Sequence, residues 1–135
     1  MITCEHKTIV TFGDTNAEGN MGHDRYASLF GKVRELFALE FIPSFKEGAG
    51  KTFLLKTKSA KYDYLRDFFF GDRICVRMTV AEVNHASFVL KAEFVNEVTD
   101  AIHAVGEQLI AFADMKNKPV RLPKALKDIL ATAAA

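Results

Sequence analysis

A glycine-rich polar loop that runs into a long amphipathic stretch is the feature that most constrains the fold of this chain. The loop covers residues 13–22, with Gly13, Gly19 and Gly22 set among hydrogen-bonding side chains. Over residues 23–41 the apolar positions recur at the i, i+3, i+4, i+7 spacing of a helix with one buried face. They are Tyr26, Leu29, Phe30, Val33, Leu36, Phe37 and Phe41. Such a stripe needs a second layer to cover it.

The rest of the chain predicts mainly β-strands, because its apolar residues alternate with polar ones. A first strand is expected before the loop, over about residues 3–12, and the helix should end before Pro43. Further strands are expected over about 52–64, 73–80, 87–95 and 102–112, with a short helix over 124–133. Consecutive strands joined by short turns predict an antiparallel meander. The fold class is therefore α+β, in a single domain over residues 1–135.

One helix covers only part of a sheet, so another face or an edge of this sheet should meet a second copy of the chain. The expected state is a homodimer or homotetramer.

Composition excludes several classes of protein. The net charge is +1, from 18 basic and 17 acidic residues, which argues against a nucleic-acid partner. The N-terminus lacks signal-peptide features, and no apolar run reaches the ~20 residues of a membrane span, so we expect a cytoplasmic protein without a membrane partner. Cys4 and Cys75 lack metal-ligand spacing and are expected to be reduced structural thiols. We predict neither a metal nor a cofactor.

Loop residues could serve the backbone or a ligand. Asn16 could form an Asx turn, Asp14 could form a turn, and Asn20 is the expected N-cap of the helix. However, the first N–H groups of a helix have no partners inside it, so this loop could also hold a carbonyl oxygen or an anion.

Four helix residues also draw attention. Arg34 falls on the flank of the apolar stripe, whereas Glu35 falls almost opposite it and should face water or another subunit. Tyr26 lies on the stripe and is expected to have a satisfied hydroxyl. His23 could act as a base, although no orienting partner is evident. The apolar run at 68–70 is compatible with a core, a tunnel or an interface.

The segments DTNAEGNMGHDRY and RELF, followed by AKYDYLRDFFFGDRICVRMTV with its Gly71-Asp72 turn, carry a resemblance. Over almost its whole length the chain resembles hotdog-fold thioesterases of the 4-hydroxybenzoyl-CoA thioesterase type. The resemblance implies one long central helix wrapped by a curved antiparallel sheet.

The chain departs from that family at one position. Much of the family has a catalytic aspartate where this chain has Asn16, and an amide cannot ionise. The loop and helix are more similar to the thioesterases of enediyne and related iterative polyketide pathways, which have an asparagine and, eighteen positions later, an arginine. Asn16 and Arg34 reproduce this pair, and Tyr26 matches a helix tyrosine. The resemblance implies hydrolysis of an acyl thioester on an acyl carrier protein without a catalytic carboxylate.

The implied chemistry is stabilisation of a tetrahedral oxyanion. Asn16 and Arg34 would be catalytic, with water as the nucleophile. Backbone N–H groups at Gly22 and His23 would assist them. Tyr26, Phe30, Gly22 and His23 are the expected substrate-binding residues.

Two alternatives remain open. An acyl-CoA thioesterase could use a carboxylate from Glu18, Asp24 or Glu35, although the place of Glu35 on the helix disfavours it. A non-catalytic module could instead bind acyl thioesters. The basic residues after the helix could bind either coenzyme A phosphates or an acidic carrier protein, so they do not discriminate.

Overall fold

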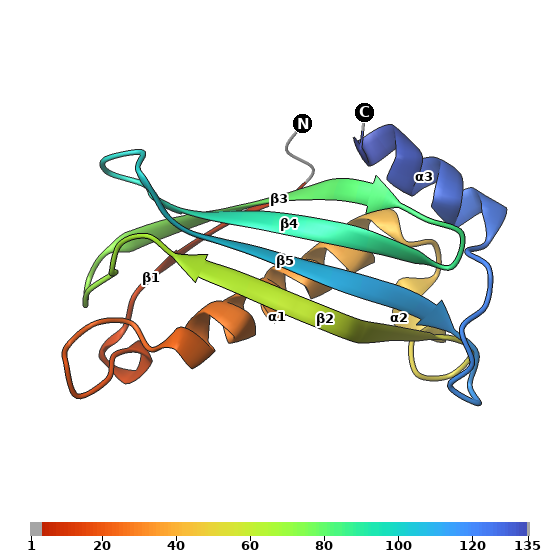
Figure 1. Cartoon of the computed structure of the whole chain (residues 1–135), viewed down its shortest axis with the longest axis horizontal. Helices are drawn as coiled ribbons and strands as arrows, with labels where there is room; N and C mark the ends of the chain where they lie inside the picture. The colour runs from red at the N-terminus through yellow and green to blue at the C-terminus, as the bar shows by residue number, and fades with distance from the viewer. Residues whose placement is uncertain (1–3, 135) are drawn as a thin grey trace.

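The structure, a computed structural model, describes residues 4–134 and has one five-stranded antiparallel sheet with three helices. The elements are β1 (Cys4–Ile9), the 3₁₀ turn Phe12–Asp14, α1 (His23–Phe41), α2 (Phe45–Gly48), β2 (Leu54–Tyr64), β3 (Arg73–Val83), β4 (Ser87–Asn96), β5 (Ile102–Ala113) and α3 (Lys124–Ala134). The sheet curves over α1, with α3 at one end (Figure 1). This is the predicted α+β hotdog arrangement.

Strand order corrects one prediction. The order is β1-β3-β4-β5-β2, so only β3, β4 and β5 form a meander, and β2 lies at an edge beside β5. The reason is the link over residues 65–72, which crosses the end of the sheet and does not turn back (Figure 1). Phe68 in this link is fully buried, and the Leu65 N–H donates to the His103 carbonyl at 2.8 Å. Phe69 and Phe70, by contrast, are exposed.

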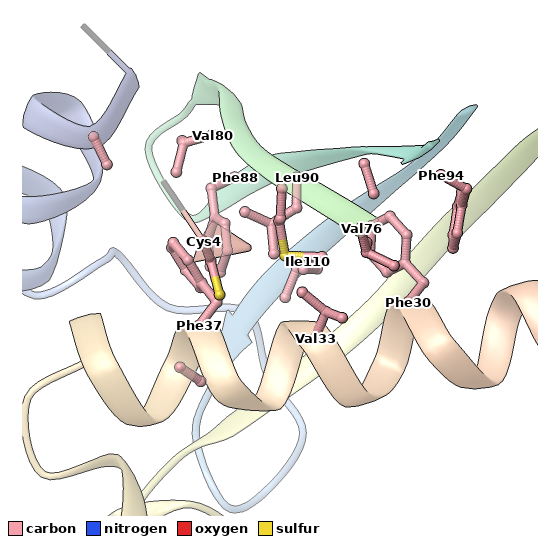
Figure 2. Close-up of a cluster of buried hydrophobic side chains, with 14 of the residues drawn as sticks. Cys4, Phe30, Val33, Phe37, Val76, Val80, Phe88, Leu90, Phe94 and Ile110 are labelled. Atoms are coloured by element: carbon pink, nitrogen blue, oxygen red, sulfur yellow. The ribbon is translucent and has the colours of Figure 1, made fainter. Parts of the chain in front are cut away.

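The core lies between α1 and the sheet. Phe30, Val33 and Phe37 point from α1 toward Val76 and Leu90 on the strands (Figure 2). All five side chains are at most 1% exposed. Burial of each such side chain stabilises the fold by about 1.5–3 kcal/mol. The apolar stripe of the helix is therefore confirmed except at Leu36, which is exposed. The alternation is confirmed for β3, β4 and β5.

The bounds of α1 are those predicted, but its N-cap is not. Gly22 occupies the cap position, and Asn20 forms part of the loop, through an isolated bridge to Phe69. The prediction of Asn20 as N-cap is wrong because the loop closes on itself before the helix begins. Ile42 is the C-cap, one residue before Pro43.

The chain ends differ slightly from expectation. β1 stops at Ile9 and the chain then forms a 3₁₀ turn, while Thr3 lies outside the described residues. The C-terminal helix is confirmed as α3, and the short α2 was not predicted. Among the described helices, none is long and apolar enough to cross a membrane.

Candidate active site

The loop before α1 is held by its own backbone. The Asn16 N–H donates to the Asn20 carbonyl and the Gly19 N–H donates to the Asn16 carbonyl, both at 2.9 Å. Gly19 has φ of +87°, a left-handed conformation that glycine adopts without strain. Below this turn, Thr15 and Met21 form a β-bridge. The loop is therefore a closed turn that holds Asn16 in one backbone position.

The Asn16 side chain makes the predicted Asx turn. Its Oδ1 accepts the Glu18 backbone N–H at 3.0 Å, and the residue is exposed. Within residues 4–134 no hydrogen bond engages its Nδ2. Because the turn occupies the oxygen, the amide N–H₂ is the part of the side chain that remains available to a ligand.

The helix start offers one of the two backbone donors that we predicted. The Gly22 N–H is already engaged by the Asp14 carbonyl, at 3.0 Å. For the His23 N–H, no partner is found in the described part of the chain.

Arg34 reaches across from the middle of α1 to β2 and β5. Its Nη1 donates to Thr57 Oγ1 and, at 2.9 Å, to Gln108 Oε1. Its Nη2 donates to the Leu55 carbonyl at 3.2 Å. Gln108 in turn donates from Nε2 to the Tyr62 hydroxyl at 3.0 Å. These bonds use three of the five guanidinium N–H groups, so the described contacts leave two uncommitted.

Burial lowers the pKa of Arg34, and the nearby negative charge of Glu35 partly opposes this effect. Arginine starts from so high a pKa that the side chain stays cationic at neutral pH. The site therefore contains a fixed, partly desolvated positive charge.

A groove of about 370 Å³ lies beside Arg34, between α1, α2 and the start of β2. Its walls are mostly small or apolar residues. They are Gly31, Arg34, Glu35, Ala38, Phe45, Ala49, Gly50, Leu54 and Leu55. A groove of this kind can take a flexible apolar chain with its polar end at the guanidinium.

Tyr26 and Phe30 lie in the core. Tyr26 is 3% exposed and its ring packs edge-on against Tyr64, with centroids 4.9 Å apart. Burial, with a smaller contribution from Asp67, raises its pKa to about 12. Phe30 is fully buried and packs edge-on against Tyr62. Contact of either residue with a substrate remains a prediction.

The three carboxylates named as alternatives lie in two places. Glu18 and Asp24 are exposed near the loop. Asp24 Oδ2 lies 3.8 Å from Arg25 Nε and forms an ion pair with it. Glu35 is exposed, as expected, and it also lines the groove beside Arg34. Within the described residues, no group of His, Cys, Asp and Glu side chains could hold a metal ion.

Within one chain, the structure does not bring Asn16 and Arg34 together. Arg34 follows His23, the first residue of α1, by eleven residues, a rise of about 16 Å along the helix. The loop over residues 13–22 lies beyond the N-terminal end of α1 (Figure 1). Arg34 lies in the middle of α1 and bonds to Leu55, near the start of β2.

Sequence reasoning missed the residues that hold Arg34. Gln108 is a polar residue at an inward-facing position of β5, between the buried Gly106 and Ile110. A polar side chain on the buried face of a strand indicates that it has a hydrogen-bond partner inside the protein, so the sequence offered a clue to Gln108. Thr57 and Tyr62 could not be found in this way, because the sequence did not show that β2 pairs with β5.

The comparisons with known proteins agree with this fold. The model of the thioesterase-like superfamily matches residues 10–130. The solved structure of the dynemicin thioesterase has a TM-score of 0.87 at 24% identity, covering 97% of this chain and 96% of that one. A gentisyl-coenzyme A thioesterase has a TM-score of 0.82 at 20% identity, covering 94% and 98%.

A hypothetical protein from Staphylococcus aureus, solved in complex with CoA, is also similar. Its TM-score is 0.89 at 18% identity, and the match covers 99% of this chain and 86% of that one. No curated protein matches the chain. At these identities the structural likeness shows the hotdog fold, and the match to the superfamily model covers most of the sequence. The chain is a hotdog-fold member of the thioesterase-like superfamily and a thioester hydrolase.

Proposed function

We propose that this chain hydrolyses the thioester of a polyketide or fatty acyl chain carried by an acyl carrier protein, using Asn16 and Arg34 as oxyanion donors. The observation that carries the proposal is that both side chains have N–H groups left uncommitted by the contacts that fix them. Asn16 is oriented by its turn with Glu18, and Arg34 by Gln108 and its other acceptors.

The reaction needs no ionised carboxylate. Water attacks the thioester carbonyl carbon, a C–O bond forms, and the carbonyl electrons move to oxygen as an oxyanion. Donors from Asn16, Arg34 and the His23 backbone would stabilise this charge. The oxyanion then collapses, the C–S bond breaks, and the proton lost from water neutralises the thiolate. Each side-chain donor is expected to contribute ~10²–10³ in rate.

The two donors would come from different subunits of a homodimer. β2 is an edge strand that pairs only with β5 among the described strands. Its Tyr64 end lies beside Tyr26, near the N-terminal end of α1, and its Leu55 end lies beside Arg34. If two copies pair antiparallel through β2, a twofold axis places the loop end of one chain beside the Arg34 end of the other. Such a dimer would contain two composite sites.

The groove beside Arg34 would receive the acyl chain. Its apolar walls suit a long chain, and crystal structures of the similar dynemicin thioesterase reveal induced-fit effects upon polyene binding by that protein. In the complete site we expect Tyr26 and Phe30 to contact the substrate, and the Gly22 turn to support the thioester. Exposed Lys56 and Lys58 on β2 would attract the acidic surface of a carrier protein, and they suit coenzyme A phosphates equally well.

One alternative is favoured by a specific observation. Glu35 lines the groove with Arg34, so an acyl-CoA thioesterase with Glu35 as general base fits the same cavity.

The test is release of thiol from matched acyl carrier protein and acyl-CoA thioesters of several chain lengths. The proposal expects faster turnover of the carrier-protein substrates and a loss of ~10²–10³ in kcat for Arg34→Ala. Turnover of CoA esters that survives this substitution supports the carboxylate alternative. No release of thiol from either kind of substrate would contradict the proposal.

A further inference from the structure

We infer that Gln108 is a positioning residue for catalysis: its buried amide holds the Arg34 guanidinium in the orientation that directs the remaining N–H groups toward the thioester. The inference rests on the proposed function and names a residue that the catalytic pair depends on.

The geometry is a chain of directed hydrogen bonds. Arg34 Nη1 donates to Gln108 Oε1 at 2.9 Å, and Gln108 Nε2 donates to the Tyr62 hydroxyl at 3.0 Å. A guanidinium has donors and no acceptor, so the amide oxygen must face Arg34 and the amide nitrogen must face Tyr62. The guanidinium thus fixes the orientation of Gln108, and the Tyr62 hydroxyl, which can donate or accept, satisfies its other end.

Burial makes these hydrogen bonds costly to lose. Gln108 is 7% exposed, so water does not replace a lost partner easily, and an unpaired amide there would be costly. A bond to a charged group in such a place is stronger than one between neutral groups.

The neighbouring backbone makes room for this arrangement. Gly106 pairs with Tyr62 in the β2–β5 ladder, and a Cβ at Gly106 would lie 2.7 Å from the Tyr62 ring. The missing side chain lets the Tyr62 ring lie across the sheet, where it packs against Phe30 and presents its hydroxyl to Gln108. Residues of two neighbouring strands therefore serve one contact to Arg34.

Gln108 is buried, and both ends of its amide already bond to protein groups, so we do not expect it to contact the substrate itself. It would act on the reaction only through Arg34. Without it, one Nη1 hydrogen would lose its acceptor and the guanidinium could rotate, which would turn the two uncommitted N–H groups away from the carbonyl oxygen.

The test is a double-mutant cycle on kcat and KM for thiol release. Gln108→Leu removes both hydrogen bonds at similar size and should lower kcat about 10–100-fold, with KM changed less than about threefold. In an Arg34→Ala background the same substitution should lower kcat by less than about twofold, since no guanidinium remains to be positioned. Tyr62→Phe leaves Gln108 in place and should lower kcat about 3–10-fold, again only when Arg34 is present.

Ile74→Val, a mild change at a buried core position, is the control for lost stability and should leave kcat unchanged in both backgrounds. An equal loss from Gln108→Leu with and without Arg34 would overturn the positioning role. Should Gln108→Leu not fold, the same comparison with Tyr62→Phe decides.

The two proposals fail in different ways. Full activity of Arg34→Ala would contradict the proposed function and, with it, the role of Gln108. A severe loss in Arg34→Ala together with full activity of Gln108→Leu would overturn only the positioning role.

Discussion

The Asn16 side-chain oxygen accepts the Glu18 backbone N–H at 3.0 Å, and this single bond decides which end of the amide faces outward. An asparagine in this turn presents an N–H donor. An aspartate would make the same turn and present a carboxylate oxygen.

Substitution of Asn16 by Asp therefore tests the donor without removing the turn. We expect Asn16→Asp to lower kcat by ~10²–10³, as Asn16→Ala does, with little change in thermal unfolding temperature. Steady-state thiol release and thermal denaturation measure the two effects. Activity at or above wild type in Asn16→Asp would mean that a carboxylate works at this position and that the donor role is wrong.

The carboxylates near the site should be dispensable. We expect Glu18→Gln, Asp24→Asn and Glu35→Gln each to change kcat by less than about threefold, because general-base catalysis contributes ~10²–10⁴ where it operates. Glu35→Gln is the most informative of the three, since Glu35 lines the groove beside Arg34. A hundredfold fall in kcat for that variant, with the protein folded, would identify Glu35 as the general base.

Two substitutions at Gly31 should affect folding stability and substrate binding separately. It lies inside α1 and lines the groove. Apart from its own helix backbone and chain neighbours, no heavy atom of the described residues would come within 4 Å of an added Cβ. Gly31→Ala should raise the free energy of unfolding by about 0.5–1 kcal/mol, because alanine loses less backbone entropy in a helix.

The larger substitution Gly31→Leu would extend into the groove. It should lower kcat/KM for long acyl chains and leave short chains unaffected. Chemical denaturation measures the first effect and a chain-length series the second. Equal loss for short and long chains would argue that the acyl chain lies elsewhere.

Tyr26 should make stability fall at alkaline pH. Burial raises the pKa of its folded form to about 12, whereas an unfolded tyrosine titrates near 10. The unfolded chain therefore releases this proton first, so the contribution is complete below about pH 10 and is lost as the pH rises toward 12. Relative to Tyr26→Phe, the wild-type free energy of unfolding should decline more steeply across this window. Parallel declines in the free energy of unfolding of the two proteins would contradict a raised pKa of Tyr26 in the folded state.

Local pattern was enough to predict much of this molecule. The bounds of α1, the alternation of β3, β4 and β5, the Asx turn at Asn16 and the flank position of Arg34 all depend on residues close in sequence. Each is set by spacing or by turn chemistry, and neither needs knowledge of the tertiary fold.

The predictions that were wrong or absent have a different cause, because they concern contacts between residues far apart in the sequence. β2 pairs with β5 because Phe68 and the surrounding link anchor across the end of the sheet, and nothing local in the 52–64 segment specifies that partner. The Gln108–Arg34 contact follows from this pairing and joins residues 74 positions apart. Asn20 was misplaced because its backbone pairs with Phe69, a contact made by a distant link.

Mixing of inactive subunits tests the central claim most directly, which is that Asn16 and Arg34 act on one thioester from two chains. Asn16→Ala and Arg34→Ala proteins would be unfolded together in equal amounts, refolded, and assayed for thiol release against each variant refolded alone. In a twofold dimer, half of the molecules become mixed and each mixed dimer has one intact site, so about a quarter of wild-type activity should return. If the mixture stays as inactive as its components while size-exclusion chromatography shows mixed dimers, the two residues do not form a shared site.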